Sequence, residues 1–179
     1  AFYGPKLDFM FKDAIGREWQ LATIQWDFNL PERFDLSFIN EKGEKEQPVV
    51  IHRAISGSLE RFIGVAIEHF GGAFPTWMSP VQVAIIPVSE KHLDYAHTVK
   101  HLLSGFSIRT ELFDGNDSLG KRIREAKMSK IPYVLVIGDK EIADNSVTVE
   151  KRGSEEKGVS IPINDFVTKI TDEIKNRSL

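Results

Sequence analysis

Polar and apolar residues alternate with period two near the start of the chain. In residues 19–28 (WQLATIQWDF) one face is apolar and the other carries Thr23, Gln25 and Asp27. This pattern predicts a half-buried strand. Residues 33–40 and the segment PVVIH, which begins at Pro48, predict two more strands on either side of the charged loop EKGEKEQ. Antiparallel pairing is therefore expected for the first part of the chain.

The period changes after Ala54. Apolar residues recur at helical spacing from Ile55 to Phe70 and stop at the Gly71-Gly72 pair, which predicts a helix over residues 55–70. On another flank of this helix we expect a shelf of small side chains that ends in a guanidinium, made by Ala54, Gly57, Ser58 and Arg61. A flat ligand could lie on such a shelf, although tight packing with Arg61 in a structural salt bridge explains the same pattern.

The second part of the chain alternates strands with helices. Residues 74–80 (FPTWMSP) lack periodicity and predict a domain boundary. Strands are expected at 81–88, 106–113, 132–138 and 147–153, and helices at 90–104, 117–129 and 163–177. The predicted fold class is α/β: an antiparallel sheet with a helix over residues 1–75, then a three-layer α/β/α domain with a mixed, mostly parallel sheet over residues 76–179.

Composition narrows the class of protein. The chain has 179 residues, of which 41% are hydrophobic and 27% are charged, as in ordinary globular proteins. With a net charge of −3 the chain lacks the overall positive charge of proteins that coat nucleic acids. With no cysteine the chain itself forms no disulfide or thiolate metal site, and the cytoplasm is the expected location. Since no apolar run approaches the roughly 20 residues of a membrane span, no membrane is expected as a partner.

Cations gather on one predicted helix. Residues 118–130 (SLGKRIREAKMSK) hold a single acid against five cations, Lys121, Arg122, Arg124, Lys127 and Lys130. Such a helix could grip phosphates through contacts that weaken as salt rises. A solvated amphipathic face is the alternative interpretation.

The histidines are weaker candidates for chemistry. His97 and His101 are spaced i, i+4, as two metal ligands on a helix could be, but the expected buried stripe of that helix leaves them at the surface. His52 ends the predicted strand PVVIH. A single imidazole is far short of a metal site, which needs three or four ligands, and a packed or hydrogen-bonded histidine is the common case.

Several longer motifs carry a family resemblance. The segments FYGPK, QLATIQWDF, PVVIHRAISGSLERFIG, GKRIREAKMSKIPYVLVIGDKE and VTVEKRG follow one another as in threonyl-tRNA synthetases, and the chain resembles the C-terminal portion of that family. The resemblance implies that residues 1–75 are the end of a class II catalytic domain, with the third signature motif at Arg61. It implies that residues 76–179 are the anticodon-binding domain shared with the histidyl, glycyl and prolyl enzymes.

The resemblance also assigns roles around ATP and threonine. It implies that ATP lies against Ser58 with Arg61 near its γ-phosphate, and that Mg accompanies ATP. Lys6 would lie beside the adenylate phosphate and His52 would be one ligand of a zinc ion that reads threonine. The amino-acid pocket would be lined by Tyr3, Gln20, Thr23 and Gln25. Gln20 lies on the opposite parity of its strand from Thr23 and Gln25, which makes its assignment the weaker one.

The implied partner of the second domain is threonine tRNA. Asn116 and Glu141 match base-reading positions, and Lys121, Arg122, Arg124 and Lys130 are the expected phosphate contacts. One departure concerns Glu150, which stands where the family commonly has an arginine. Lys151 and Arg152 follow it directly and could substitute.

Two functions remain open at this point. The first is an ATP-dependent threonine–tRNA ligase that forms a homodimer, in which this chain supplies the third motif, one zinc ligand and anticodon recognition. The second is a non-catalytic tRNA-binding module or a truncated synthetase paralogue. In the family, the other zinc ligands and the first two motifs lie upstream of the position of Ala1, so the chain alone is expected to be inactive.

Overall fold

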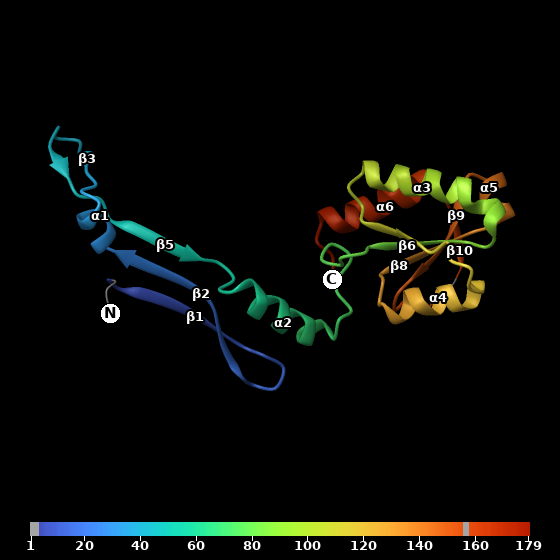
Figure 1. Cartoon of the computed structure of the whole chain (residues 1–179), viewed down its shortest axis with the longest axis horizontal. Coiled ribbons are helices and arrows are strands. Elements are labelled where there is room, and N and C mark those ends of the chain that lie inside the picture. The colour runs from blue at the N-terminus through green and yellow to red at the C-terminus, as the bar shows by residue number, and fades with distance from the viewer. Residues whose placement is uncertain (1–3, 156–157) are drawn as a thin grey trace. The chain divides into compact units, whose positions relative to one another are not determined.

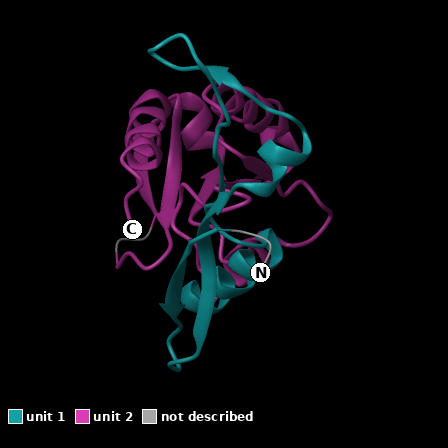
Figure 2. Ribbon diagram, turned by 90° about the vertical axis from the view of Figure 1, so that its left-hand side faces the viewer, with its two compact units in different colours: residues 1–70 teal, residues 71–179 magenta. Residues whose placement is uncertain are grey.

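A computed structural model describes residues 4–155 and 158–179 of the chain. The chain divides into two compact units, residues 1–70 and residues 71–179 (Figure 2). The boundary expected between residues 75 and 76 falls inside the segment 71–82, which precedes the first strand of the second unit.

The first unit is built on an antiparallel sheet of three strands (Figure 1). Strands β1 (Lys6–Lys12), β2 (Glu18–Asp27) and β5 (Val50–Ala54) lie in the order β1-β2-β5. Between β2 and β5 the chain forms the short helix α1 (Asn29–Arg33) and a hairpin of β3 (Phe38–Ile39) and β4 (Lys45–Glu46). Helix α2 (Leu59–Phe70) follows β5.

Two predictions for this unit were incomplete. Strand β1 was not predicted, and the strand expected over residues 33–40 is reduced to Phe38–Ile39. Helix α1 takes up the start of that range because the buried carboxylate of Asp27 accepts hydrogen bonds from the backbone N–H groups of Asn29 and Leu30, at 2.9 and 3.1 Å. A side-chain acceptor at this point satisfies donors that the first turn of a helix leaves unpaired.

Helix α2 begins four residues later than expected. Ala54 belongs to β5 and Gly57 has a left-handed backbone with φ of +63°, so neither lies on the helix. Ser58 acts as the N-cap, since its hydroxyl accepts a hydrogen bond from the N–H of Arg61 at 3.1 Å. The small residues are therefore brought together by a turn that leads into the helix, and the predicted shelf along a helix face is wrong.

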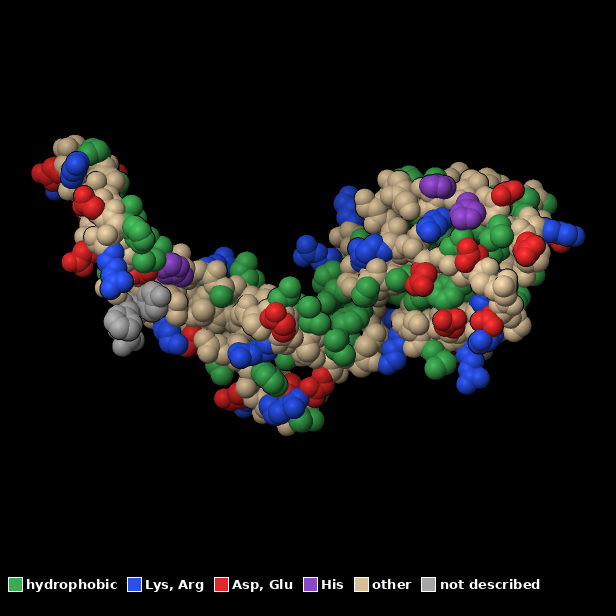
Figure 3. All heavy atoms as spheres, viewed as in Figure 1, with side chains coloured by type: hydrophobic (Ala, Val, Ile, Leu, Met, Phe, Trp, Pro, Cys, Tyr) green, Lys and Arg blue, Asp and Glu red, His purple; other side chains and the backbone are tan. Residues whose placement is uncertain are grey.

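The first unit buries little apolar surface of its own. Of the 21 buried hydrophobic side chains among the described residues, only Leu21 lies in residues 1–70. Helix α2 has no buried residue, and its side chains Leu59, Ile63 and Ile67 are exposed by 65%, 45% and 48%. Figure 3 shows hydrophobic side chains at the surface of this unit. Burial within residues 1–70 therefore contributes little to the stability of the chain.

The second unit contains a mixed sheet of five strands in the order β10-β9-β8-β6-β7. Strands β6 (Val83–Pro87), β7 (Thr110–Leu112) and β8 (Tyr133–Ile137) are parallel. Strand β9 (Ser146–Lys151) pairs antiparallel with both β8 and β10 (Val159–Pro162). The connecting segments are η1 (Glu90–His92), α3 (Leu93–Gly105), α4 (Leu119–Met128), α5 (Asp139–Ala143) and α6 (Ile163–Lys175).

Helices cover both faces of this sheet. Side chains of α3 and α6, among them Val99, Leu103 and Phe166, pack with Ile85 and Leu135 on one face. On the other face Ala126 of α4 packs with Ala84, Ile86 and Val134. These two layers of helix around a mixed sheet confirm the predicted α/β class. Strand β10 and helix α5 were not predicted.

Two arginines and a lysine hold the segment 71–82 onto the rest of the second unit. Arg109 donates to the carbonyls of Trp77, Ser79 and Pro80, at distances of 2.8–3.2 Å. Arg152 donates to the carbonyls of Ala73, Phe74 and Lys130, and the ammonium of Lys130 donates to that of Gly71. We call these contacts the carbonyl clamp.

Within residues 4–155 and 158–179 none of the helices has the length and hydropathy that crossing a membrane requires.

Candidate functional site

The sheet of the first unit gathers polar side chains on one face. Lys6 of β1, Gln25 of β2 and His52 of β5 form one row across the three strands, and Asp8, Thr23 and Ala54 form the next. Residues directly opposite each other in an antiparallel pair project to the same side. Five of the predicted substrate and metal residues, including the bulge-shifted Gln20, therefore share this polar face: Lys6, Gln20, Thr23, Gln25 and His52. Tyr3, also predicted for this pocket, lies outside the described residues.

Asp8, which no pattern in the sequence singled out, is the centre of the polar face. Its carboxylate accepts hydrogen bonds from the Gln20 amide at 2.7 Å and the Thr23 hydroxyl at 2.8 Å, and it pairs with the Lys6 ammonium at 2.8 Å. Hydrogen bonds from Lys6 and Thr23 lower the pKa of Asp8. The signal available in the sequence was the i, i+2 spacing from Lys6, which becomes meaningful once β1 is recognised as a strand.

A β-bulge explains how Gln20 reaches the polar face. Along the β1–β2 pair, Phe9 lies opposite Ala22 while the next residue, Met10, lies opposite Gln20, so β2 contains one extra residue at Leu21. An extra residue reverses the alternation of side chains beyond it. The parity argument against Gln20 was therefore wrong, and its amide joins Thr23 on the carboxylate of Asp8.

The turn before α2 is seated on this bulge. A Cβ at Gly57 would lie 2.6 Å from the carbonyl oxygen of Leu21, so glycine is needed both for the close approach and for the positive φ. The guanidinium of Arg61 donates to the carbonyl of Gln20 at 3.1 Å and lies 6.0 Å from the ring centroid of Trp19. Arg61 and Ser58 are thus fixed beside the strand that supplies Gln20 and Thr23.

His52 is paired with a buried carboxylate. Its Nε2 lies 2.8 Å from Oδ2 of Asp27, whose side chain is fully buried, while the imidazole itself is 42% exposed. Burial raises the pKa of Asp27, but hydrogen bonds from His52 and from two backbone N–H groups outweigh burial and lower it. The imidazole belongs to the polar face and does not point into an apolar interior.

The polar face offers one histidine to a metal ion. A carboxylate that orients an imidazole is common around zinc-bound histidines, so His52 fits the role of a single ligand. Among the described residues, however, no group of three or more His, Cys, Asp or Glu side chains is arranged to hold a metal. His97 and His101 are exposed on α3, as expected.

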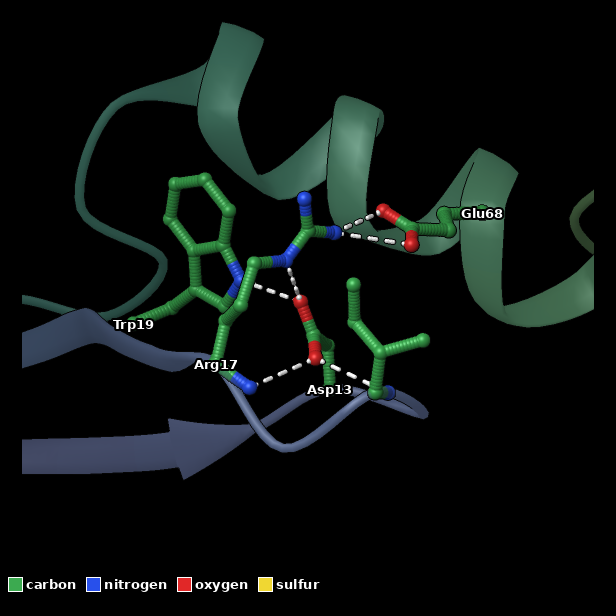
Figure 4. A network of polar contacts seen from close by, with 5 residues as sticks. Asp13, Arg17, Trp19 and Glu68 are labelled. Atoms are coloured by element: carbon green, nitrogen blue, oxygen red, sulfur yellow. Dashed lines mark hydrogen bonds and ion pairs between the residues drawn. The ribbon is translucent and has the colours of Figure 1, made fainter.

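A polar network ties the β1–β2 turn to α2 (Figure 4). Asp13 accepts hydrogen bonds from Nε of Arg17 at 2.5 Å and from the indole N–H of Trp19 at 2.9 Å. The other end of the Arg17 guanidinium donates to both carboxylate oxygens of Glu68, at 2.6 and 2.7 Å. Because Arg17 and Arg61 both approach the ring of Trp19, this network helps to fix the position of Arg61.

The network predicts an unusually acidic Asp13. Burial raises its pKa, but hydrogen bonds from Trp19 and Arg17 outweigh burial and lower the pKa from 3.8 to about 2. Since the folded pKa lies below the unfolded one, the network stabilises the fold above pH 3.8 and is lost only as the pH falls toward about 2.

We expect the NMR signal of the Trp19 indole N–H to stay constant from neutral pH to about pH 3.5. The indole N–H of Trp77, for which the described residues offer no hydrogen-bond partner, serves as the internal control. A Trp19 titration with a midpoint near 3.8, the ordinary value for Asp, would show that the carboxylate is not held in this network.

In the second unit the predicted base-reading residues lie near the carboxyl ends of the parallel strands. Asn116 is exposed in the loop after β7 and lines a cavity of about 250 Å³ together with Ser89, Glu90 and Asp117. Glu141 of α5 is buried, with 8% of its surface exposed. Its carboxylate accepts the backbone N–H of Gly138 at 2.8 Å and the hydroxyl of Thr148 at 2.7 Å. Burial raises the pKa of Glu141, but these hydrogen bonds outweigh it and lower the pKa.

The basic helix is less uniform than predicted. Arg122 is 7% exposed and donates to the backbone carbonyls of Pro87, Val88, Phe113 and Asp117, so the prediction that it grips phosphate is wrong. Lys130 lies beyond the end of α4 and belongs to the carbonyl clamp. Lys121, which pairs with Asp117 at 2.8 Å, and Arg124 are the predicted phosphate contacts that remain exposed on the helix.

The suggested substitutes for the missing arginine are also engaged elsewhere. Lys151 pairs with Glu173 at 2.8 Å and lies 5.4 Å from the ring centroid of Tyr133. Arg152 belongs to the carbonyl clamp. Glu150 itself pairs with Lys127 at 2.5 Å. Neither Lys151 nor Arg152 is therefore placed to act for residue 150.

Two families match the two units. Residues 1–70 match the family described as the tRNA synthetase class II core domain (G, H, P, S and T). Residues 82–173 match the anticodon binding domain family. The first match covers the polar face and the turn at Gly57, and the second covers the five-stranded sheet with its helices.

Named relatives agree with these matches. The chain is 54% identical over 177 residues to the threonine–tRNA ligase of Sulfurihydrogenibium sp. (strain YO3AOP1), and 51% identical over 179 residues to threonine–tRNA ligase 2 of Bacillus subtilis (strain 168). These alignments cover 99% and 100% of this chain. The chain spans 27% and 28% of the length of these two relatives.

Solved structures give the same picture. The RNA binding domain of threonyl-tRNA synthetase from Cryptosporidium parvum Iowa II is 38% identical with a TM-score of 0.85, over 96% of this chain and 44% of that one. The prolyl-tRNA synthetase of Giardia lamblia shares the fold at 20% identity, with a TM-score of 0.72 over 98% of this chain and 40% of that one. The chain therefore belongs to the anticodon binding domain family through residues 82–173, matches the class II tRNA synthetase core domain in residues 1–70, and is similar over its whole length to threonine–tRNA ligases.

Proposed function

We propose that this chain is part of a threonine–tRNA ligase, which activates threonine with ATP and transfers it to threonine tRNA. The observation that carries the proposal is the polar face, on which Lys6, Gln20, Thr23 and His52 lie together while Arg61 is held beside Gln20. The anticodon-binding fold of the second unit supports tRNA as the partner.

Two cations of the first unit suit adenylate chemistry. Activation of an amino acid by ATP places negative charge on the pyrophosphate that leaves, and a fixed guanidinium offsets such charge. Arg61 has that role in the proposal, because its side chain is already anchored by the carbonyl of Gln20. Lys6 approaches the phosphate of the adenylate, and to do so it must leave its pairing with Asp8. Mg bound to ATP would add further positive charge when present.

The amino-acid side of the pocket is formed by polar groups. Thr23, Gln25 and Gln20 offer hydroxyl and amide groups that suit the amino and hydroxyl groups of threonine. Such a pocket discriminates against valine, because an amino acid without the hydroxyl leaves these groups unpaired. A zinc ion, when bound, would coordinate the substrate, and from this chain His52 would hold it, oriented by Asp27.

The decisive experiment uses the full-length protein and measures threonine-dependent ATP–pyrophosphate exchange. We expect Arg61→Ala to lower kcat/KM by about 100-fold or more, the usual loss when one fixed stabilising group is removed. Arg53→Ala is the matched control, because Arg53 lies opposite Ile24 and therefore projects to the other face of the sheet. Equal loss in both variants would contradict the role of Arg61, and absence of exchange in the unaltered protein would contradict the proposed function.

The isolated chain is expected to show no exchange, because the described residues offer His52 to the proposed zinc ion but hold no group of three or more ligating side chains. We propose a homodimer for the full-length ligase, and the cytoplasm as the place where it meets its tRNA. Size measurement of the full-length protein in solution tests the dimer.

A second candidate function is a tRNA-binding module without catalysis. The observation that favours it is the distribution of the core, since 20 of the 21 buried hydrophobic side chains among the described residues lie in the second unit. Under this alternative, the full-length protein binds threonine tRNA but shows no threonine-dependent exchange. The same two assays therefore separate the two candidates.

A further inference from the structure

His92 is a buried histidine that neither the sequence analysis nor the proposed chemistry uses. It ends the single-turn helix η1, which follows β6, and it is 4% exposed. Its position is beside the cavity that Asn116 lines, because Ser89 and Glu90 of the same turn line that cavity as well. A buried imidazole needs partners on both ring nitrogens, and these partners reveal its role.

The contacts define the protonation state of the ring. The backbone N–H of Ser89 points at Nδ1 of His92 with a distance of 3.0 Å. A backbone N–H can only donate, so Nδ1 must be the unprotonated acceptor. The proton then lies on Nε2, which faces Oδ1 of Asp139 at 3.2 Å. The described geometry therefore requires the neutral Nε2–H tautomer.

The imidazole joins two segments at the edge of the sheet. Through Nδ1 it holds the turn after β6, and through Nε2 it reaches Asp139, the first residue of α5. Two residues further along α5, Glu141 binds Gly138 and Thr148. His92 thus connects the cavity of Asn116 with the helix that carries Glu141, and these are the two residues predicted to read bases.

We propose that His92 is a positioning residue for RNA recognition, and that it acts only in its neutral form. The inference rests on the proposed function, because it assigns the carboxyl edge of this sheet to contact with the anticodon loop. Protonation would place a hydrogen on Nδ1, which the Ser89 hydroxyl at 3.0 Å can accept but the Ser89 N–H cannot. The N–H would then lose its acceptor, so the turn after β6 would have to move. The geometry of the cavity beside Asn116 would change with it.

The charged groups around the His92 ring do not by themselves couple its protonation to movement of the turn after β6. Asp139 is in contact but is 96% exposed, and Glu90 and Lys91 belong to the same turn as His92. Arg122 of α4 holds the carbonyl of Val88, next to Ser89. A protonated histidine near RNA would by charge alone strengthen phosphate binding as the pH falls. Positioning by the neutral ring predicts the opposite sign, so the direction of the pH dependence separates the two.

The test measures binding of this chain to an RNA hairpin that carries a threonine anticodon, at constant low salt, from about pH 7.5 to about pH 5.5. We expect the affinity of the unaltered chain to fall about fivefold or more over this range, as expected for one lost hydrogen bond. His92→Asn keeps an acceptor near the position of Nδ1 and cannot gain a proton, so its affinity should change less than about twofold.

Two more variants complete the experiment. His92→Gln places its amide near Asp139 and leaves Ser89 without an acceptor, so it should bind weakly at every pH. His101→Asn, at an exposed histidine of α3, should keep the profile of the unaltered chain. As a measurement that needs no variant, the NMR shift of the Ser89 amide should titrate with the same midpoint as the RNA affinity.

The outcomes are distinct. If the unaltered chain and His92→Asn share one pH profile, or if binding strengthens as the pH falls, the positioning role is wrong. A Ser89 amide shift that does not follow the affinity also contradicts the positioning role, even where a variant fails to fold. If the unaltered chain does not bind the hairpin at pH 7.5, the proposed tRNA partner is itself contradicted.

Discussion

Replacing Gly57 with alanine is expected to lower threonine-dependent ATP–pyrophosphate exchange by the full-length protein about 100-fold, because a displacement of about 1 Å at a catalytic group can cost that much. The added Cβ would lie 2.6 Å from the carbonyl oxygen of Leu21, and the backbone would need a φ of +63°. Backbone atoms of β2 cannot move aside as a flexible side chain could. The turn must therefore lift from the bulge and carry Ser58 and Arg61 away from Gln20.

Gly64→Ala is the matched control for this experiment. Gly64 lies inside α2, has no positive φ, and no atom beyond its chain neighbours and the backbone of its own helix lies within 4 Å of the position that a Cβ would take. Alanine there should leave exchange unchanged and favour the helix by about 1 kcal/mol. If Gly57→Ala kept full activity, the close approach between the turn and β2 would not be what positions Arg61. If both variants lost activity equally, the loss would reflect sensitivity of α2 in general.

Arg122 and Arg124 of α4 lie only two residues apart, but the same substitution should affect the free energy of unfolding very differently at the two positions. Arg122→Met is expected to lower the free energy of unfolding of the second unit by about 3 kcal/mol, because it removes buried, charge-assisted hydrogen bonds to four backbone carbonyls. Arg124→Met should change stability by less than about 0.5 kcal/mol, as at other exposed positions. Hydrogen exchange of the β6 and β8 amides, monitored as urea is increased, measures this difference in the free energy of unfolding for the second unit.

RNA binding completes the comparison. Lys121→Glu combined with Arg124→Glu should weaken binding of threonine tRNA about tenfold at low salt and reduce its salt dependence, while the second unit stays folded. Binding that is as tight as that of the unaltered chain would remove α4 as a phosphate contact.

An Arg122→Met variant with full stability would show that the carbonyls of Pro87 and Phe113 are satisfied without the guanidinium.

Hydrophobic periodicity was sufficient for most of the second unit. Its strands and helices are long apolar runs or clear stripes, and the family motifs named the fold. The failures came from features that periodicity does not encode. Strand β10 and helix α5 are short, and the burial of Arg122 depends on carbonyls from residues 87–117.

In the first unit the limits of sequence reasoning were tighter. Thr23 and Gln25 were placed on one face by alternation alone, and the register of β2 bears this out. The position of Gln20 could not be predicted, because a bulge is set by pairing with β1, a strand that was itself missed. Asp8 escaped for the same reason. Gly57 was singled out by its residue type, but the reason for glycine, the approach to Leu21, required the fold.

The carbonyl clamp has a practical consequence for anyone who wishes to graft the second unit onto another protein. The prolines of residues 74–80 suggest a natural cut, yet truncation at residue 76 would strip Arg152 of two of its acceptors, the carbonyls of Ala73 and Phe74. A transplant that starts at Gly71 keeps every acceptor of Arg109, Arg152 and Lys130. The portable piece is therefore longer at its N-terminal end than its first strand indicates.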